Sequence, residues 1–184
     1  VFIIIGDTVY VTYINLFPFE EDGQKLIGFK KFFPRQSLKD INVSGIFNFN
    51  KKHNVWQFKA NRTSLINALN YLLKDNQVKI NSELKISDIK IRKMLLEQSY
   101  IKDRHFKSCP DEFLEYIQAK NYSTSTFNTY HNLAIRFLNS FRGHTLLQVN
   151  SFGIYEIEKY HTLWNQRDSP SASLVNQSIN AIKL

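Results

Sequence analysis

The spacing of apolar residues changes along this chain from a strand-like to a helical period, and this change constrains the fold more than any other feature. In the first 60 residues, β-branched and aromatic residues form short runs bounded by polar turns, which is typical of β-strands. From Cys109 onward, apolar residues recur every three or four positions, as they do on one face of a helix. A chain of 184 residues is long enough for one large domain or two small ones. We therefore predict an α+β fold with a strand-rich N-terminal domain and a helical C-terminal one.

The strand-rich domain is predicted to span residues 1–75. Runs at 2–5 and 9–16 are joined by Gly6-Asp7, a two-residue hairpin signal, and a third strand is expected over 26–33. A second hairpin is expected further along the chain, because two short apolar runs flank the polar turn Lys51-Lys52-His53-Asn54.

A helix is predicted to follow this hairpin, with Thr63 or Ser64 as its N-cap. Its expected apolar stripe consists of Leu65, Ile66, Leu69, Leu72 and Leu73. Residues 76–108 are rich in Lys and Asn and include one expected helix, which begins at Ser87. We interpret this segment as a basic helical connector.

Residues 109–184 are expected to form four short helices. The first begins near Pro110, and the second begins after the N-cap Ser123 and ends at Gly143. The third is predicted to start at Asn150 or Ser151, and the fourth follows Pro170. The apolar side of the third helix is expected to carry Ile154, Ile157, His161 and Trp164.

Basic charge is concentrated in the middle of the chain. The formal net charge is +8, and residues 25–107 hold 18 Lys and Arg against 6 Asp and Glu, whereas residues from 109 onward hold six of each sign. Clustered basic side chains displace counterions from phosphate, so the excess is consistent with a nucleic-acid partner. An AT-rich genome would also enrich Lys together with Asn, Ile, Phe and Tyr, and it explains the same bias equally well.

Several kinds of site are disfavoured by the residues present. Cys109 is the single cysteine, so no disulfide can form within the chain, and no Gly-rich phosphate loop or Gly-x-Ser-x-Gly motif occurs. His105 lies four residues before Cys109, but Pro110 and the lack of two further ligands argue against a metal site. We expect no metal and no cofactor. The longest apolar run, residues 1–5, is too short for a membrane span and lacks signal-peptide features, so we expect a cytoplasmic protein without membrane contact.

Two stretches of the helical part carry a family pattern. The first runs Phe113-Leu114-Glu115-Tyr116-Ile117, Lys120, Tyr122-Ser123-Thr124-Ser125-Thr126-Phe127, Tyr130 and Phe137-Leu138, and the second covers residues 171–183, where Ser, Asn-Gln, Ala and Lys recur in that order. Residues 109–184 thereby resemble the core-binding domain of tyrosine recombinases, the phage-integrase family. Leu174 departs from the pattern, since the family more often has Thr there. More weakly, Trp56-Gln57-Phe58 resembles a strand in the N-terminal extension of integrases from mobile elements.

The resemblance implies an order of domains and a partner. It implies a small arm-like α+β domain over 1–75, the basic connector over 76–108, and a four-helix, SAM-like core-binding domain over 109–184. Such a domain grips double-stranded DNA at a recombination site, and protomers of the family assemble on that DNA. The DNA contacts that the resemblance implies are Lys120, Ser123, Thr124, Ser125, Asn128, Thr129, Asn132, Arg136, Ser173, Asn176, Gln177, Asn180 and Lys183.

Strand transfer in the family depends on residues of a downstream catalytic domain. No His-x-x-Arg spacing occurs here, and the nine tyrosines lie mostly at apolar positions of expected helices or strands. The chain begins without Met and stops at Leu184, about where the catalytic domain would start. We therefore expect a DNA-binding, non-enzymatic fragment of a longer bacterial integrase. The alternative hypothesis is a helical protein-interaction module, which the neutral charge of residues 109–184 would suit; salt-dependent binding to duplex DNA separates the two.

Overall fold

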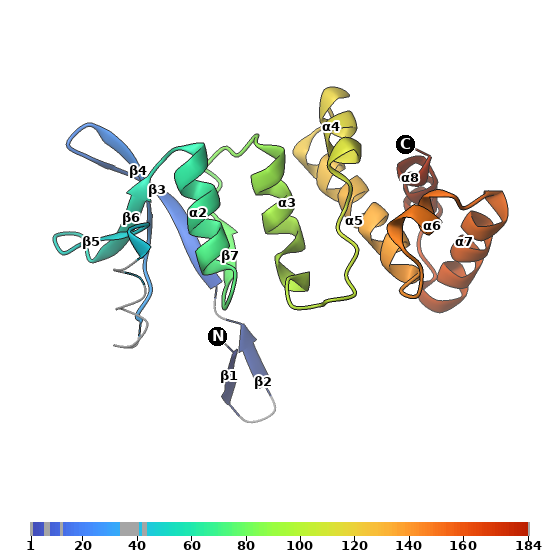
Figure 1. Cartoon of the computed structure of the whole chain (residues 1–184), viewed down its shortest axis with the longest axis horizontal. Helices are drawn as coiled ribbons and strands as arrows, with labels where there is room; N and C mark the ends of the chain where they lie inside the picture. Colours follow the sequence, from blue (N-terminus) through green and yellow to red (C-terminus); the bar gives the residue numbers. More distant parts are fainter. Residues whose placement is uncertain (1, 6–7, 12, 34–40, 42–43, 184) are drawn as a thin grey trace. The chain divides into compact units, whose positions relative to one another are not determined.

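The computed structural model describes residues 2–5, 8–11, 13–33, 41 and 44–183 (Figure 1). The structure is 51% helical and 17% strand, which confirms a mixture of helices and sheet. It divides into two compact units, Val1–Ile101 and Lys102–Leu184, each with a hydrophobic core of its own.

The first unit is built on a five-stranded sheet. Its strands are β3 (Tyr13–Glu21), β4 (Gln24–Phe29), β5 (Asn48–Asn50), β6 (Val55–Lys59) and β7 (Gln77–Ile80). They lie in the order β5-β6-β4-β3-β7, and all neighbours are antiparallel except β3 and β7, which are parallel. A separate antiparallel pair is formed by β1 (Phe2–Ile5) and β2 (Thr8–Val11) (Figure 1).

The observed strands differ from the predicted ones near the start of the sheet. The strand expected over 9–16 is divided between β2 and β3, and the expected Gly6-Asp7 turn lies outside the described residues. The hairpin between β3 and β4 turns at Asp22 and Gly23, which have φ values of 50° and 75°. Two successive positive φ values are the geometry that lets a two-residue turn join strands with the natural right-handed twist. The strand expected over 26–33 begins earlier, as β4, and ends at Phe29.

The predicted hairpin around the Lys51–Asn54 turn is confirmed by β5 and β6. The β6 residues Trp56 and Phe58 are opposite Phe29 and Ile27 of β4, and all four side chains are buried. The neighbouring Gly28 is opposite Phe17, whose ring would lie 2.8 Å from a Cβ at position 28. Glycine at this point therefore lets the Phe17 ring lie across β4.

Among the described residues, the helices α2 and α3 pack on the sheet in the first core. The helix α2 (Arg62–Leu72) begins two or three residues earlier than expected, because the side chain of Asn61 accepts a hydrogen bond from the backbone N–H of Ser64 at 2.9 Å. Its buried residues are Leu65, Ala68, Leu69 and Leu72, which confirms most of the predicted stripe. The helix α3 (Ile89–Glu97) has Asp88 as its N-cap and continues into the short 3₁₀ helix η1 (Gln98–Tyr100).

The segment predicted as a connector belongs largely to the first unit. Its strand β7 pairs with β3, and the side chain of Gln98 bonds both backbone groups of Val78, at 2.6 Å to the N–H and 3.0 Å to the carbonyl. Ile91 of α3 is 3% exposed within the same core. Sequence periodicity missed β7 because a four-residue edge strand carries too little pattern to detect.

The second unit contains five helices among its described residues, where the sequence predicted four. They are α4 (Asp111–Ala119), α5 (Thr124–Ser140), α6 (Leu146–Asn150), α7 (Ile154–Asp168) and α8 (Ala172–Ile182). Ser123 caps α5 as predicted, but α5 ends at Ser140 rather than at Gly143. The third predicted helix is α7, which begins at Ile154 rather than at residue 150 or 151. The extra helix is α6, which the sequence did not predict and which starts at a capping box formed by Thr145 and Gln148.

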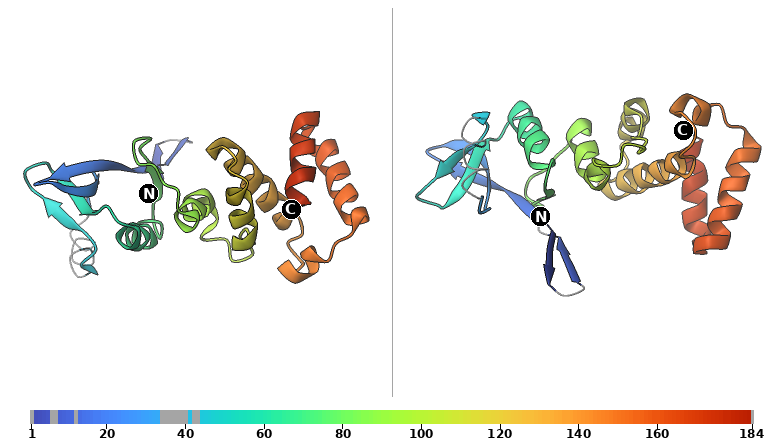
Figure 2. Two further views of the ribbon diagram at one scale, coloured as in Figure 1. Left: turned by 90° about the horizontal axis from the view of Figure 1, so that it is seen from above. Right: turned by 60° about the horizontal axis from the view of Figure 1, so that its bottom comes forward.

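The core of the second unit lies where α5, α7 and α8 meet. It is made of Leu133, Phe137, Leu138, Val149, Tyr160, Trp164 and Ala181. The helix α5 packs directly against α8, and α7 runs beside α8 (Figure 2). Inside this core, the Nε2 atom of His161 lies 3.1 Å from the hydroxyl of Ser178, which joins α7 to α8.

Candidate functional site

The residues predicted to contact DNA lie around α5 and on α8, and none of them is buried. The exposed ones are Lys120, Ser123, Thr124, Ser125, Asn132, Ser173, Asn176, Asn180 and Lys183. Asn128, Thr129, Arg136 and Gln177 are half-buried. The helices α5 and α8 pack against each other through their apolar sides. The predicted residues around α5 and those on α8 therefore belong to the same unit.

The N-terminal turn of α5 combines free backbone donors with hydroxyl groups. The Ser123 hydroxyl accepts a hydrogen bond from the N–H of Thr126 at 3.1 Å and lies 2.9 Å from the Thr126 hydroxyl, so its first role is to cap the helix. Thr129 donates to the carbonyl of Ser125 at 3.0 Å. The exposed Lys120 precedes the helix, with its ammonium 5.1 Å from the ring of Tyr116. A helix N-terminus beside a lysine attracts anions such as phosphate.

The outer face of α8 is uncharged and polar up to its last turn. Ser173, Asn176 and Asn180 are exposed along this face, and Gln177 lies beside them with its amide 3.5 Å from the Ser173 hydroxyl. The opposite side of the helix places Ser178 and Ala181 in the core. Asn and Gln amides can donate to and accept from base edges, so this face has the chemistry for groove contacts although it adds little charge.

Arg136 departs from the role that the resemblance implies. Its guanidinium forms an ion pair with Asp168 at the end of α7 and lies 4.5 Å from the centre of the Trp164 ring. Asp168 is also bonded by Arg167, at 2.8 Å and 3.2 Å. The charge of Arg136 is therefore partly offset within the unit by a carboxylate that it shares with Arg167, and its observed contacts join α5 to α7.

The basic residues expected to form a connector are divided between the two units. Lys79 in β7 places its ammonium 3.8 Å from the ring centre of Tyr13. Arg92 is half-buried, and burial lowers the pKa of its guanidinium. In the second unit, the Lys107 ammonium donates to the carbonyl of Phe141 at 2.7 Å, while both backbone groups of Lys107 bond the side chain of Asn139. These basic side chains therefore have structural contacts in addition to charge.

The part of the chain that the structure describes contains no cluster of potential metal ligands. No group of three or more His, Cys, Asp and Glu side chains comes together within the described ranges. Cys109 is fully buried, whereas His105, four residues earlier, is exposed. Among the described helices, none combines the length and apolar character needed to cross a bilayer.

Sequence reasoning missed one feature of the second unit, a groove along α7. Ile154, expected on the buried side of this helix, is 76% exposed, and Tyr155 and Leu163 are exposed as well. The signal was present in the sequence, because a helix with apolar residues on more than one face has more apolar surface than a single core can cover.

Comparisons with known proteins do not place the chain in a family. No protein-family model matches it, and neither the curated proteins nor the solved structures include a significant match.

Proposed function

We propose that this chain is the DNA-binding part of a tyrosine-type site-specific recombinase, a cytoplasmic bacterial protein that acts in DNA integration. In this proposal the second unit holds duplex DNA with α5 and α8, and no residue of the chain takes part in strand transfer. Copies of the protein would assemble side by side on the recombination site, as members of that family do.

The observation that carries the proposal is the pair of polar faces on α5 and α8. The thirteen residues that the resemblance implies all lie at least partly exposed in the structure. Ten of them are on α5 and α8, which pack against each other, and Lys120, Ser123 and Lys183 lie next to helix ends. Outward Asn, Gln, Ser and Thr side chains can read base edges or bond phosphate oxygens. The free N–H groups at the start of α5 add a site for one phosphate.

Charge predicts that binding by this chain is weak and sensitive to salt. Six basic and six acidic residues follow position 108, and Arg136 is paired with Asp168. Affinity for phosphate must then come mainly from Lys120, Lys183 and the exposed basic residues that precede α4. Each phosphate contact that is lost should reduce the salt dependence of binding by about one unit of logarithmic slope.

Fluorescence anisotropy with a labelled duplex, repeated over a series of salt concentrations, tests the proposal. Asn176→Ala combined with Asn180→Ala should weaken binding to a selected sequence by about tenfold or more, because each lost base contact costs about 1–3 kcal/mol. Lys120→Ala should weaken binding to all duplexes and lower the salt slope. Asn165→Ala, an exposed asparagine of α7 outside the proposed face, is the matched control and should change neither.

Two results would count against DNA binding. The first is an absence of salt-dependent binding to any duplex, which would favour the alternative of a protein-interaction module. The second is an equal loss of binding in the Asn165 control and in the α8 variant, because the effect would then not depend on the proposed face.

A further inference from the structure

An apolar stripe on the outside of α7 has no partner within the described residues of its unit. Tyr155 is 70% exposed and Leu163 is 56% exposed, and Lys159 lies between them at the same helical spacing. Residues four apart lie on one face of a helix, so these three side chains form a single line along α7. Large apolar side chains in a row on a surface commonly mark an interaction site.

The stripe borders a groove of about 800 Å³ between α7 and the end of α5. Its floor is made of aromatic rings that pack on one another. The ring centre of Phe141 lies 4.7 Å from that of Phe152 and 6.3 Å from that of Tyr160. The rings of Tyr160 and Trp164 are stacked, with their centres 5.9 Å apart. Tyr160 and Trp164 are held by the core behind them, at 6% and 2% exposed. The floor of the groove is therefore part of the packed core, and its rim carries exposed polar and apolar side chains.

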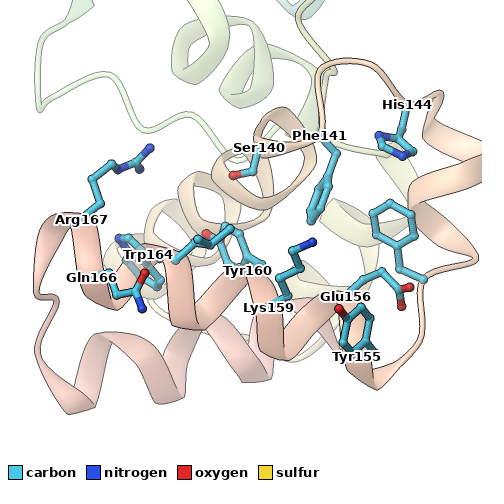
Figure 3. Close-up of a pocket in the computed structure, with 12 residues that line it drawn as sticks. Ser140, Phe141, His144, Tyr155, Glu156, Lys159, Tyr160, Trp164, Gln166 and Arg167 are labelled. Carbon is cyan, nitrogen blue, oxygen red and sulfur yellow. The ribbon is translucent and has the colours of Figure 1, made fainter.

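A lysine stands at the middle of the groove. Figure 3 shows the Lys159 ammonium directed across the groove, with Arg167, which is paired with Asp168, at one end and the imidazole of His144 at the other. The single carboxylate of the lining, Glu156, is committed to its own helix, because it accepts a hydrogen bond from the N–H of Gly153 at 2.9 Å. Lys159 has no such partner among the residues that the structure describes. An occupant that carries a carboxylate would therefore meet an available cation in the middle of the groove.

We propose that this groove binds an acidic amphipathic helix of another protein. The lining runs along α7 from Tyr155 to Arg167, a distance of about 18 Å at 1.5 Å per residue. This length fits a helix of about three turns that lays its apolar side in the groove, with anchors at i, i+3 or i+4, and i+7. The aromatic floor would take the anchors, and a carboxylate of the partner helix would pair with Lys159.

The proposal is independent of DNA binding. None of the thirteen residues assigned to DNA lines the groove, so a protein helix could bind α7 while duplex DNA binds α5 and α8. Failure of one proposal would leave the other standing.

A phage-displayed library of helical peptides of about three to four turns, selected on the whole protein, tests the groove. We expect enrichment of peptides with aromatic or aliphatic anchors at helical spacing and with Asp or Glu beside them. Leu163→Glu should weaken binding of the enriched peptides by about tenfold or more, because it places a carboxylate on the apolar rim. Lys159→Glu should reduce binding of acidic peptides and restore binding when their carboxylate is changed to Lys.

Thr162→Glu is the matched control, since it adds the same charge to the same helix at an exposed position outside the groove lining. It should leave peptide binding unchanged, and circular dichroism should show that all three variants are folded. Three outcomes would overturn the proposal: no enrichment, enrichment of peptides that Leu163→Glu does not affect, or self-association that Leu163→Glu abolishes in sedimentation experiments. The last outcome would assign the groove to a second copy of this chain.

Discussion

The pair formed by His161 and Ser178 shows how single polar residues can fix the arrangement of two helices. Both side chains are buried, and the Nδ1 atom of His161 lies 2.9 Å from the carbonyl of Ile157. A carbonyl can only accept, so Nδ1 carries a proton, and in a neutral imidazole Nε2 then accepts from the Ser178 hydroxyl. Each ring nitrogen thus has a partner, and the pair specifies the depth at which α8 lies against α7.

Ser178→Ala is expected to destabilise the second unit by about 1–3 kcal/mol, because it leaves the buried Nε2 acceptor of His161 without a donor. Urea unfolding followed by circular dichroism measures this difference. Ser173→Ala removes a hydroxyl from the same helix at an exposed position, and its effect should stay within about 0.5 kcal/mol. Equal effects of the two substitutions would show that the buried hydrogen bond contributes nothing.

At the scale of secondary-structure elements, Asp88 links α2 to α3. Its carboxylate caps α3 by accepting from the N–H of Ile91 at 3.0 Å, and it pairs with Arg62 in the first turn of α2. Partial burial by itself raises the pKa of Asp88, but the hydrogen bonds from Arg62 and Ile91 outweigh it, and the pKa is lowered overall. The folded state therefore binds this proton less readily than the unfolded chain does.

This shift predicts a dependence of stability on pH. The contribution of the Asp88 carboxylate is complete above its unfolded pKa of about 3.9 and is lost as the pH falls through the lower folded value. Asp88→Asn keeps a capping side chain but loses the charge, so its stability should fall less steeply than that of the natural chain below about pH 4. At neutral pH the cost should be below about 1 kcal/mol, since Arg62 is largely exposed.

Chemical denaturation at a series of pH values, with Glu83→Gln as a control for the loss of an exposed carboxylate, checks the prediction for Asp88. A pH profile of Asp88→Asn that runs parallel to that of the natural chain would contradict it.

The elements that could be predicted from the sequence are those with enough residues to show a period. The stripes of α2 and α5 and the cap at Ser123 were predictable because each signal is local. The strand β7 and the five-residue helix α6 were not, since one depends on pairing with a strand about 60 residues earlier and the other is barely longer than one turn. Exposure of the polar faces could likewise be predicted, whereas the ion pair between Arg136 and Asp168 depends on how α5 and α7 pack.

At the scale of the whole molecule, the two hydrophobic cores share no residue. One contains Leu69 with the buried residues of the sheet, α2 and α3, and the other contains Leu138 with those of α5, α7 and α8. Each core also contains one of the two tryptophans, Trp56 in the first and Trp164 in the second. Fluorescence from single-tryptophan variants can therefore follow each unit separately.

We expect the units to unfold as separate cooperative transitions, because each has a hydrophobic core that shares no residue with the other. In a Trp164→Phe background, Leu69→Ala should lower the stability reported by Trp56 by about 2–5 kcal/mol, the usual cost of removing a buried leucine side chain. In a Trp56→Phe background, the same Leu69→Ala change should leave the transition reported by Trp164 unmoved. Leu138→Ala should give the reverse result. Denaturant titrations of the four variants measure these shifts, and a Leu69→Ala effect of equal size on both tryptophans would show one cooperative structure instead of two.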